Sequence, residues 1–339
     1  MADKRERILY VIGNGFDRCH GLDTSTERFK EILRRQEIYN ENDTAQEVYE
    51  CYGVLWGDYE SCLANIDLEA IEENQMIAPD YMSDHEYDRD GGIFNMEQYT
   101  ESLYQAVQKS LEIMVDNANQ MLAEIKPPLR NFLTIGDAVI NFNYTSTLEE
   151  LYNIPENIRV YHIHGFRKNG EKLLIGYNHG MSAEEYDNKY FDKDAIEKLQ
   201  MQIRELESNE TLTDNDRRDE LIYWNSCYDE LTSDRDYYVD KQREMVFQFY
   251  QSLKKEIQID RLARLIKECG KIDEIIVMGH SMSDVDGDYM ELIEQLVNPL
   301  EWRISQFENS PSQEDVREYS FAKKIQFYDL LKEFSSEII

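Results

Sequence analysis

Short apolar runs separated by longer amphipathic stretches dominate the chain. The clearest runs are five or six residues long, contain β-branched residues and end in polar or glycine-containing segments, which is typical of buried strands. They occupy residues 8–12, 138–142, 158–163 and 274–279. Weaker candidates are residues 172–176, 302–305 and 324–328. Helical patterns follow several of these runs, and this alternation predicts an α/β fold with a Rossmann-like parallel sheet flanked by helices.

Two long segments, about 65–129 and 183–257, interrupt this alternation with helical spacing. The second segment is densely charged, so we expect exposed antiparallel helices with one narrow apolar stripe that faces the core or another subunit. The sequence is therefore compatible with a homo-oligomer as well as with a monomer. We predict a single α/β nucleotide-binding domain over residues 1–339 with two helical insertions. Thr24 and Glu27 have the spacing of a capping box, which predicts the start of a helix.

Charge and cysteine content narrow the classes of partner. The 339 residues include 36 Lys and Arg against 69 Asp and Glu, a formal net charge of −33, which disfavours direct nucleic-acid binding and adhesion to anionic membranes. A small anionic ligand stays open, because backbone N–H groups at a helix start hold phosphate without basic side chains. No apolar run is long enough to span a membrane or to form a signal peptide. The five cysteines form no C-x-x-C pair, so we expect a cytoplasmic protein with reduced thiols.

A glycine turn follows the first predicted strand and precedes a helix. It consists of Gly13, Asn14, Gly15, Phe16 and Asp17. Strand, glycine turn and helix together are the arrangement that aims backbone N–H groups at the pyrophosphate of a dinucleotide. The G-x-G-x-x-G pattern is incomplete, because Arg18 stands where the third glycine is expected. By spacing alone, phosphate binding and a plain tight turn both stay open.

Two further strand ends carry candidate chemistry. Asn143 follows the second strand, at a position where asparagine is often a structural turn residue but where α/β sheets also place ligands. His162 and His164 lie at the end of the third strand, where positions i and i+2 share a face. The remaining histidines lack metal-like spacing, so no metal site is expected. His164, beside Gly165, is the better candidate for a general base.

The fourth strand ends in Gly279-His280-Ser281, which resembles the nucleophile elbow of α/β hydrolases. That pattern requires glycine where Ser283 stands. Its catalytic triad also requires a histidine later in the chain, and none follows His280. We therefore exclude a serine hydrolase and predict a loop at the ligand-binding edge.

Three aspartates follow this loop: Asp284, Asp286 and Asp288. Carboxylates in such a group can hold Mg²⁺, or they can simply face solvent. Both interpretations stay open from spacing alone.

Taken in order, these segments resemble the AbiH abortive-infection family of bacterial phage-defence proteins. The resemblance is carried by residues 11–22 (VIGNGFDRCHGL), 56–67 (WGDYESCLANID), 142–149 (FNYTSTLE), 162–165 (HIHG) and 279–289 (GHSMSDVDGDY). It runs almost the full length of the chain. Asp23 stands where the family usually has proline.

The family in turn resembles, remotely, the sirtuin-like NAD-binding fold. This likeness implies that Asn143 lies near the nicotinamide ribose and that His164 is the catalytic histidine. It also implies that the residues at the first and fourth strand ends bind the cofactor, namely Gly13, Asn14, Gly15, Phe16, Asp17, Gly279, Ser281 and Asp286. The chain lacks the Cys₄ zinc module of protein deacetylases. Thr145 replaces the acid of the sirtuin Asn-x-Asp turn, which leaves catalytic competence open.

The resemblance therefore implies an anti-phage effector that hydrolyses NAD or a related nucleotide, with Asn143 and His164 as catalytic residues and no metal. Its implied partners are a small nucleotide and a phage-derived trigger or a defence partner protein. The alternative is a non-catalytic nucleotide sensor that signals through the helical insertions. A metal-dependent nuclease built on the three aspartates is disfavoured by the negative charge.

Overall fold

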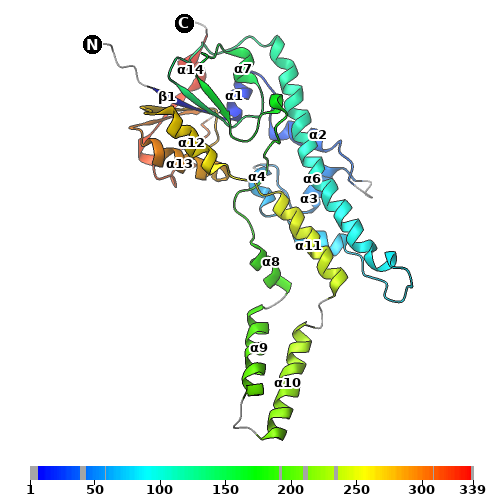
Figure 1. Cartoon of the computed structure of the whole chain (residues 1–339). Coiled ribbons are helices and arrows are strands. Elements are labelled where there is room, and N and C mark those ends of the chain that lie inside the picture. The colour runs from blue at the N-terminus through cyan, green and yellow to red at the C-terminus, as the bar shows by residue number, and fades with distance from the viewer. Residues whose placement is uncertain are drawn as a thin grey trace. The chain divides into compact units, whose positions relative to one another are not determined.

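The sheet expected from the apolar runs forms the centre of the fold (Figure 1). The structure is a computed structural model, and it describes residues 7–38, 43–57, 59–190, 193–208, 213–232, 236–307 and 309–336. The strands are β1 (Ile8–Ile12), β2 (Ala138–Asn141), β3 (Arg159–His162), β4 (Glu274–Met278), β5 (Trp302–Gln306) and β6 (Ile325–Asp329). β1, β2 and β4 are buried on both faces, which explains why they are continuous apolar runs.

The described strands form one parallel sheet in the order β3-β2-β1-β4-β5-β6. The N-terminal strand β1 therefore lies in the middle, paired with β2 on one side and β4 on the other. Successive strands are added outward from β1, first in one direction and then in the other. This is the order of a Rossmann-like, doubly wound fold, as the sequence predicts.

The helices fill the connections between strands. They are α1 (Asn14–Cys19), α2 (Thr26–Leu33), α3 (Ala45–Cys51), α4 (Tyr59–Leu63), α5 (Leu68–Gln75), α6 (Tyr87–Met121), α7 (Thr147–Leu151), α8 (Ala183–Tyr190), α9 (Lys193–Ser208), α10 (Asp214–Thr232), α11 (Tyr237–Ser252), α12 (Ile259–Cys269), α13 (Gly287–Val297) and α14 (Leu330–Phe334). None of the described helices is long and apolar enough to cross a membrane.

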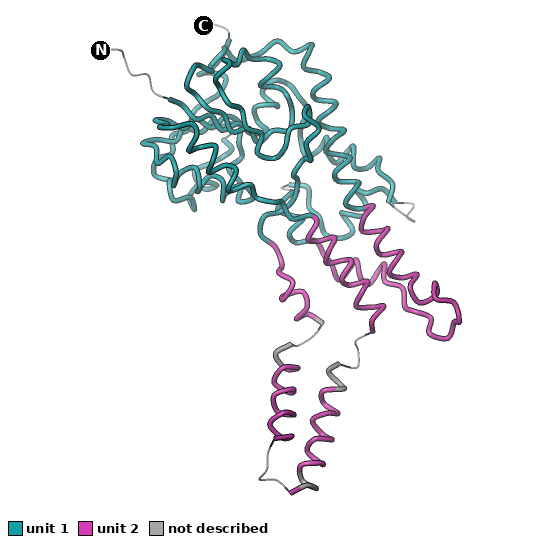
Figure 2. Tube along the Cα trace, viewed as in Figure 1, with its two compact units in different colours: residues 1–65, 103–179, 253–339 teal, residues 66–102, 180–252 magenta. Residues whose placement is uncertain are grey.

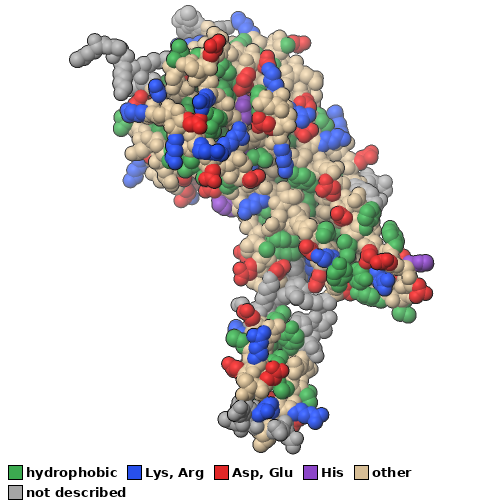
Figure 3. Space-filling view, in the orientation of Figure 1, with side chains coloured by type: hydrophobic (Ala, Val, Ile, Leu, Met, Phe, Trp, Pro, Cys, Tyr) green, Lys and Arg blue, Asp and Glu red, His purple; other side chains and the backbone are tan. Residues whose placement is uncertain are grey.

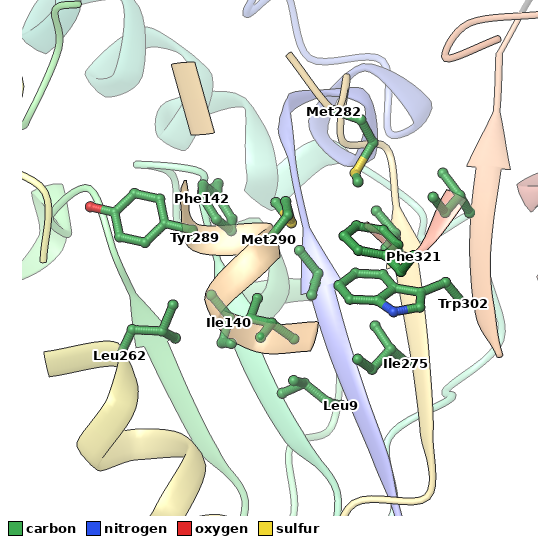
Figure 4. Close-up of a cluster of buried hydrophobic side chains, with 14 of the residues drawn as sticks. Leu9, Ile140, Phe142, Leu262, Ile275, Met282, Tyr289, Met290, Trp302 and Phe321 are labelled. Carbon is green, nitrogen blue, oxygen red and sulfur yellow. The ribbon is translucent and has the colours of Figure 1, made fainter. Parts of the chain in front are cut away.

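The two faces of the sheet bury separate hydrophobic clusters. On one face, Leu262 of α12 and Tyr289 and Met290 of α13 pack against Ile140 and neighbouring strand residues (Figure 4). On the other face the cluster includes residues of α1, α7 and α14. Each strand residue thus has a defined side, and successive polar residues at the strand ends also point to opposite sides of the sheet.

The described chain divides into two compact units (Figure 2). The first contains the sheet and consists of residues 1–65, 103–179 and 253–339, and the second consists of residues 66–102 and 180–252. The second unit is helical and falls largely within the two segments predicted as helical insertions. In it, α9 packs beside α10 and α11 packs against α5. Most of the described side chains of α9 and α10 are exposed, as their charge pattern predicts.

Two local predictions are wrong. Residues 172–176 are not a strand; Leu173 is buried in a loop, and the Leu174 amide donates one hydrogen bond to the His164 carbonyl at 2.8 Å. Ser25, not Thr24, is the N-cap of α2, because its hydroxyl accepts from the Arg28 amide. The apolar pattern could not distinguish a buried loop from an edge strand.

The surface carries charges of both signs. On the face drawn in Figure 3, acidic and basic side chains are interspersed among polar and apolar ones. Several acidic side chains at the surface form ion pairs. The carboxylate of Asp116, for example, accepts two hydrogen bonds from the Arg167 guanidinium, each at 2.9 Å.

Candidate functional site

The carboxyl ends of four neighbouring strands meet at one edge of the sheet. β3, β2, β1 and β4 are adjacent and parallel, and hydrogen bonds continue past their ends. The Phe142 amide donates to the Ile12 carbonyl at 2.8 Å, and the Gly13 amide donates to the Met278 carbonyl at 3.0 Å. The strand order reverses between β1 and β4, which is where Rossmann-like sheets bind their ligands. The four predicted motifs therefore share this edge.

The glycine turn after β1 packs directly on the turn after β4. The Gly15 amide donates to the Gly279 carbonyl at 2.6 Å. Gly279 has a φ of +71°, and a Cβ atom there would lie 2.2 Å from the Phe16 nitrogen. A Cβ atom on Gly13 would lie 2.6 Å from the Cα atom of His280. The glycines are thus required for close contact between two loops, and their predicted role in binding pyrophosphate stays a prediction.

Three other predicted cofactor residues differ in exposure. Asn14 is exposed, and its side-chain amide donates to the Thr24 carbonyl at 2.9 Å. Ser281 is exposed. Phe16 is fully buried and packs on Phe132 and other aromatic residues, so its side chain belongs to the core.

Asp17 is the centre of a buried polar cluster. Its carboxylate accepts hydrogen bonds from the hydroxyls of Thr145 at 2.8 Å and Thr147 at 2.6 Å. Burial raises the pKa of Asp17 to about 6, although the polar side chains of Thr147, Thr145 and Asn143 oppose this shift. The Asn143 side-chain nitrogen is also buried, and it makes no hydrogen bond of normal geometry. Asp17 therefore combines a pKa raised to about 6 with three polar side chains, those of Thr147, Thr145 and Asn143, around its carboxylate.

The backbone of Asn143 is held from both sides. Its amide donates to the Asn141 side chain at 3.0 Å, and its carbonyl lies 2.8 Å from Nδ1 of His162. The other ring nitrogen of His162 lies 2.8 Å from the Glu149 carboxylate, and the ring stacks on Phe166 at 3.9 Å. His162 is thus fully engaged in positioning the Asn143 turn.

His164 faces a different carboxylate. Its Nε2 atom lies 3.2 Å from Oδ1 of Asp286 but makes no hydrogen bond of normal geometry. His280 lies 3.3 Å from the other oxygen of Asp286. The prediction that the rings of His162 and His164 point together is therefore wrong. β3 ends at His162, and the two rings contact different side chains: His162 stacks on Phe166, and His164 packs against Phe142.

Phe142 connects the two clusters. It directly precedes Asn143, and its ring packs against His164 at 5.1 Å and His280 at 4.6 Å between ring centroids. Tyr144, on the other side of Asn143, has its ring 6.1 Å from that of His164. The residues that flank Asn143 thus form one wall of the His164 environment.

A buried lysine completes the cluster around Asp286. The side chain of Lys255 has no solvent exposure, and its ammonium lies 3.3 Å from Asp286 and 3.0 Å from Glu60. Glu60 also accepts the Gly176 amide at 3.2 Å. The sequence prediction missed both Lys255 and Glu60. Glu60 lies within residues 56–67, one of the segments that carry the family resemblance, whereas Lys255 had no signal beyond its charge.

The charged side chains in this cluster shift one another's pKa values. Burial would raise the pKa of Asp286, but Lys255 and the neighbouring imidazoles hold it well below its usual range. Burial and the Lys255 charge lower the pKa of His164, although Asp286 and Glu60 oppose them. Burial would lower the pKa of Lys255, but Glu60 and Asp286 raise it. The arrangement favours a neutral imidazole between an ammonium and a carboxylate, which is the state a proton acceptor requires.

The three aspartates after β4 do not converge on one point. Asp286 faces Lys255 and the two histidines, Asp288 accepts from the Asn178 side chain at 2.8 Å, and Asp284 is exposed. Among the described residues, no group of three or more His, Cys, Asp and Glu side chains is placed to hold a metal ion.

Comparison with known proteins gives a family but no solved relative. Neither the curated proteins nor the solved structures include a match to this chain. A family model described as "Bacteriophage abortive infection AbiH" matches residues 9–306, a range that contains β2 to β5, all of β1 except Ile8, and every residue of the two polar clusters. The chain therefore belongs to the AbiH family of bacteriophage abortive infection proteins.

Proposed function

We propose that the chain is an effector of abortive infection that hydrolyses a nucleotide, with NAD as the favoured substrate. The observation that carries this proposal is the state of His164. It is a buried imidazole with a lowered pKa, its Nε2 atom lies 3.2 Å from Oδ1 of Asp286, and it stands at the edge where Rossmann-like sheets bind nucleotides. A neutral imidazole oriented by a carboxylate is the usual arrangement of a general base.

The chemistry we propose is attack of water on the ribose carbon that carries nicotinamide. The bond between this carbon and the pyridinium nitrogen breaks, the electron pair goes to the ring, and neutral nicotinamide leaves. The attacking water loses a proton to His164, which acts as the general base. Positive charge develops on the ribose in the transition state, so the site has to orient the ribose and the water more than it has to supply a strong nucleophile.

Asn143 and Asp17 fit the ribose side of this reaction. We propose that the buried amide nitrogen of Asn143, which lies beside the Asp17 carboxylate, donates to a ribose hydroxyl or to the water. Asp17 supplies a carboxylate next to Thr145, at the point where the sirtuin turn has its acid. We therefore propose that Asp17 replaces that acid, with its charge stabilising the developing positive charge of the ribose.

The phosphates are proposed to lie beside the two glycine turns. The amides of Gly13 and Gly15 already donate to the carbonyls of Met278 and Gly279, so we propose that other groups beside these turns also contact the phosphates. The exposed side chains of Asn14 and Ser281 flank these turns, and the Asn14 amide, which donates one hydrogen bond to the Thr24 carbonyl, has a second N–H. They are our candidates for contact with the pyrophosphate.

The test is incubation of the purified full-length protein with NAD, NADP and ATP, with and without lysate of infected cells. Appearance of nicotinamide and ADP-ribose, lost in His164→Gln, would support the proposal. Tight nucleotide binding without turnover under both conditions would contradict hydrolysis and would favour a nucleotide sensor. The trigger, whether of phage origin or a defence partner protein, is identified by fractionating whichever lysate starts turnover.

A further inference from the structure

Lys255 is an unusual residue to find fully buried. Lysine is almost never buried unless it is paired, and Lys255 is paired with two carboxylates, Glu60 and Asp286. Its backbone position is fixed, because its amide donates to the Tyr177 carbonyl at 2.7 Å while the Tyr177 amide donates to Leu253 at 3.1 Å. The fold therefore places one positive charge at a defined point beside His164.

The two histidines on Asp286 are not equivalent. Nδ1 of His280 accepts the Met282 amide at 3.0 Å, which leaves its Nε2–H as a donor to the carboxylate. His280 is thus held in one tautomer. His164 has no such constraint on Nε2, which shares Oδ1 of Asp286 with the lysine. Of the two, His164 is the imidazole that shares a carboxylate oxygen with the lysine.

We propose that Lys255 is a positioning residue that keeps His164 neutral, and therefore able to accept a proton, by placing a permanent positive charge on the carboxylate that His164 faces. The inference rests on the proposed function only for its catalytic meaning. The electrostatic part stands on the geometry of the cluster.

The groups around His164 define the direction of each effect. Its charged neighbours are the carboxylates of Asp286 and Glu60 and the ammonium of Lys255. Its other close neighbours are the rings of Phe142, Tyr144 and Tyr289. Without the lysine, His164 would face two carboxylates and no cation, which favours the imidazolium. Without Glu60 it would face one carboxylate and one cation, which disfavours the imidazolium further.

The experiment is a pH titration of the histidine ring signals by NMR, in the full chain labelled at histidine. The His164 signal is identified by its loss in His164→Gln. Lys255→Met should move the His164 midpoint to higher pH, and Glu60→Gln should move it to lower pH. Lys254→Met is the matched control, because Lys254 is the exposed neighbour of Lys255 in the chain and should cause no shift. Lys255→Arg should restore a midpoint near that of the parent protein.

Opposite shifts for Lys255→Met and Glu60→Gln would support the inference, since loss of packing alone has no reason to reverse sign. Equal or same-direction shifts would overturn it. If Lys255→Met does not fold, Glu60→Gln decides, and an unchanged or higher midpoint there overturns the inference. This readout needs no turnover, so it is independent of whether NAD is hydrolysed. Where turnover is found, the loss of rate at low pH should begin at a higher pH in Lys255→Met than in the parent protein. An unchanged pH profile of the rate would show that Lys255 does not act on catalysis through His164.

Discussion

His162 and His164 stand two residues apart, but the structure gives them different tasks. His162 uses both ring nitrogens within the protein, on the Asn143 carbonyl and on Glu149. His164 instead faces the Asp286 carboxylate, with its Nε2 atom 3.2 Å from Oδ1. Glutamine at position 164 keeps a polar side chain beside Asp286, whereas loss of His162 leaves a buried carbonyl without its donor.

We therefore predict opposite profiles for two variants. His162→Ala should lower the free energy of unfolding by about 1–3 kcal/mol, because it leaves a buried carbonyl without its donor. His164→Gln should leave stability nearly unchanged but reduce nucleotide turnover by about 10²–10⁴-fold, the usual cost of losing a positioned base. Denaturant unfolding and a turnover assay on the same preparations distinguish them. Similar losses of turnover in both variants, with equal stability, would contradict the assignment.

Asp17 leads to a prediction about pH. Its pKa is raised from 3.8 to about 6 in the folded protein, so the native state binds the proton more tightly than the unfolded state. Stability contributed by the neutral carboxyl is present below pH 4 and is lost as the pH rises towards 6. The difference of about 2 pH units corresponds to about 3 kcal/mol.

Asp17→Asn cannot ionise, so its stability relative to the parent protein should rise by about that amount between pH 4 and pH 7. Urea unfolding of both proteins at several pH values measures the difference. A gap that does not change with pH would show that Asp17 keeps an ordinary pKa.

The residues that sequence reasoning found are those that directly follow a strand. Asn143 and His164 could be found because strand ends are visible as breaks in apolar runs. Lys255 and Glu60 could not, because they are 195 residues apart and their pairing exists only after folding. A lysine beside another lysine, as at positions 254 and 255, gives no signal of which one is buried.

At the scale of elements, the contact between the β1 and β4 turns should be the least tolerant part of the fold. Gly279→Ala places a methyl group 2.2 Å from backbone and also forces a positive φ. We expect a loss of more than about 4 kcal/mol of stability, or no folded protein.

Gly21→Ala is its matched control. Gly21 has a similar φ of +77°, but a Cβ atom there would meet nothing within 4 Å. The cost should be the backbone strain alone, about 1–2 kcal/mol. Comparing the two unfolding midpoints separates strain from close packing, and similar midpoints would show that the loops can move apart.

Elements were predicted well where burial is complete and less well where it is partial. β1, β2 and β4 are buried on both faces, and their apolar runs identify them directly. Residues 172–176 are mostly apolar as well, and the Leu174 amide donates to the His164 carbonyl after β3, but they do not pair with a strand of the sheet. The composition of a segment does not show whether it has a neighbouring strand to pair with. The observed N-cap of α2 lies one residue after the predicted one, because the Thr24 hydroxyl donates to the Asn14 side chain instead. A local sequence pattern does not contain this contact between two segments.

At the scale of the whole molecule, the helical hairpin of α9 and α10 should be dispensable for the sheet. Residues 193–232 lie in the second unit, and none of those whose side chains the structure describes belongs to either hydrophobic cluster of the sheet. Replacing them with a short Gly-Ser linker should leave the unfolding of the sheet unit cooperative. Hydrogen exchange of peptides from β1 and β4 measures this directly.

A longer deletion, from residue 193 through residue 257, should in contrast disturb the sheet. It removes Lys255 and also Ile257, which packs against the α12 and α13 face. Exchange in β4 should then increase. Loss of protection in both deletions would show instead that the hairpin supports the sheet.

The central place of β1 has a consequence for synthesis of the protein. β1 is translated before both of its neighbours in the sheet, β2 at residue 138 and β4 at residue 274. The carboxylate that His164 faces is translated later still, at residue 286. Translation at about 5–20 residues per second therefore leaves a period of many seconds in which the nascent chain has its glycine turn but no assembled site. For a member of an abortive infection family, the order of the strands means that the proposed site cannot be assembled before Asp286 has been translated.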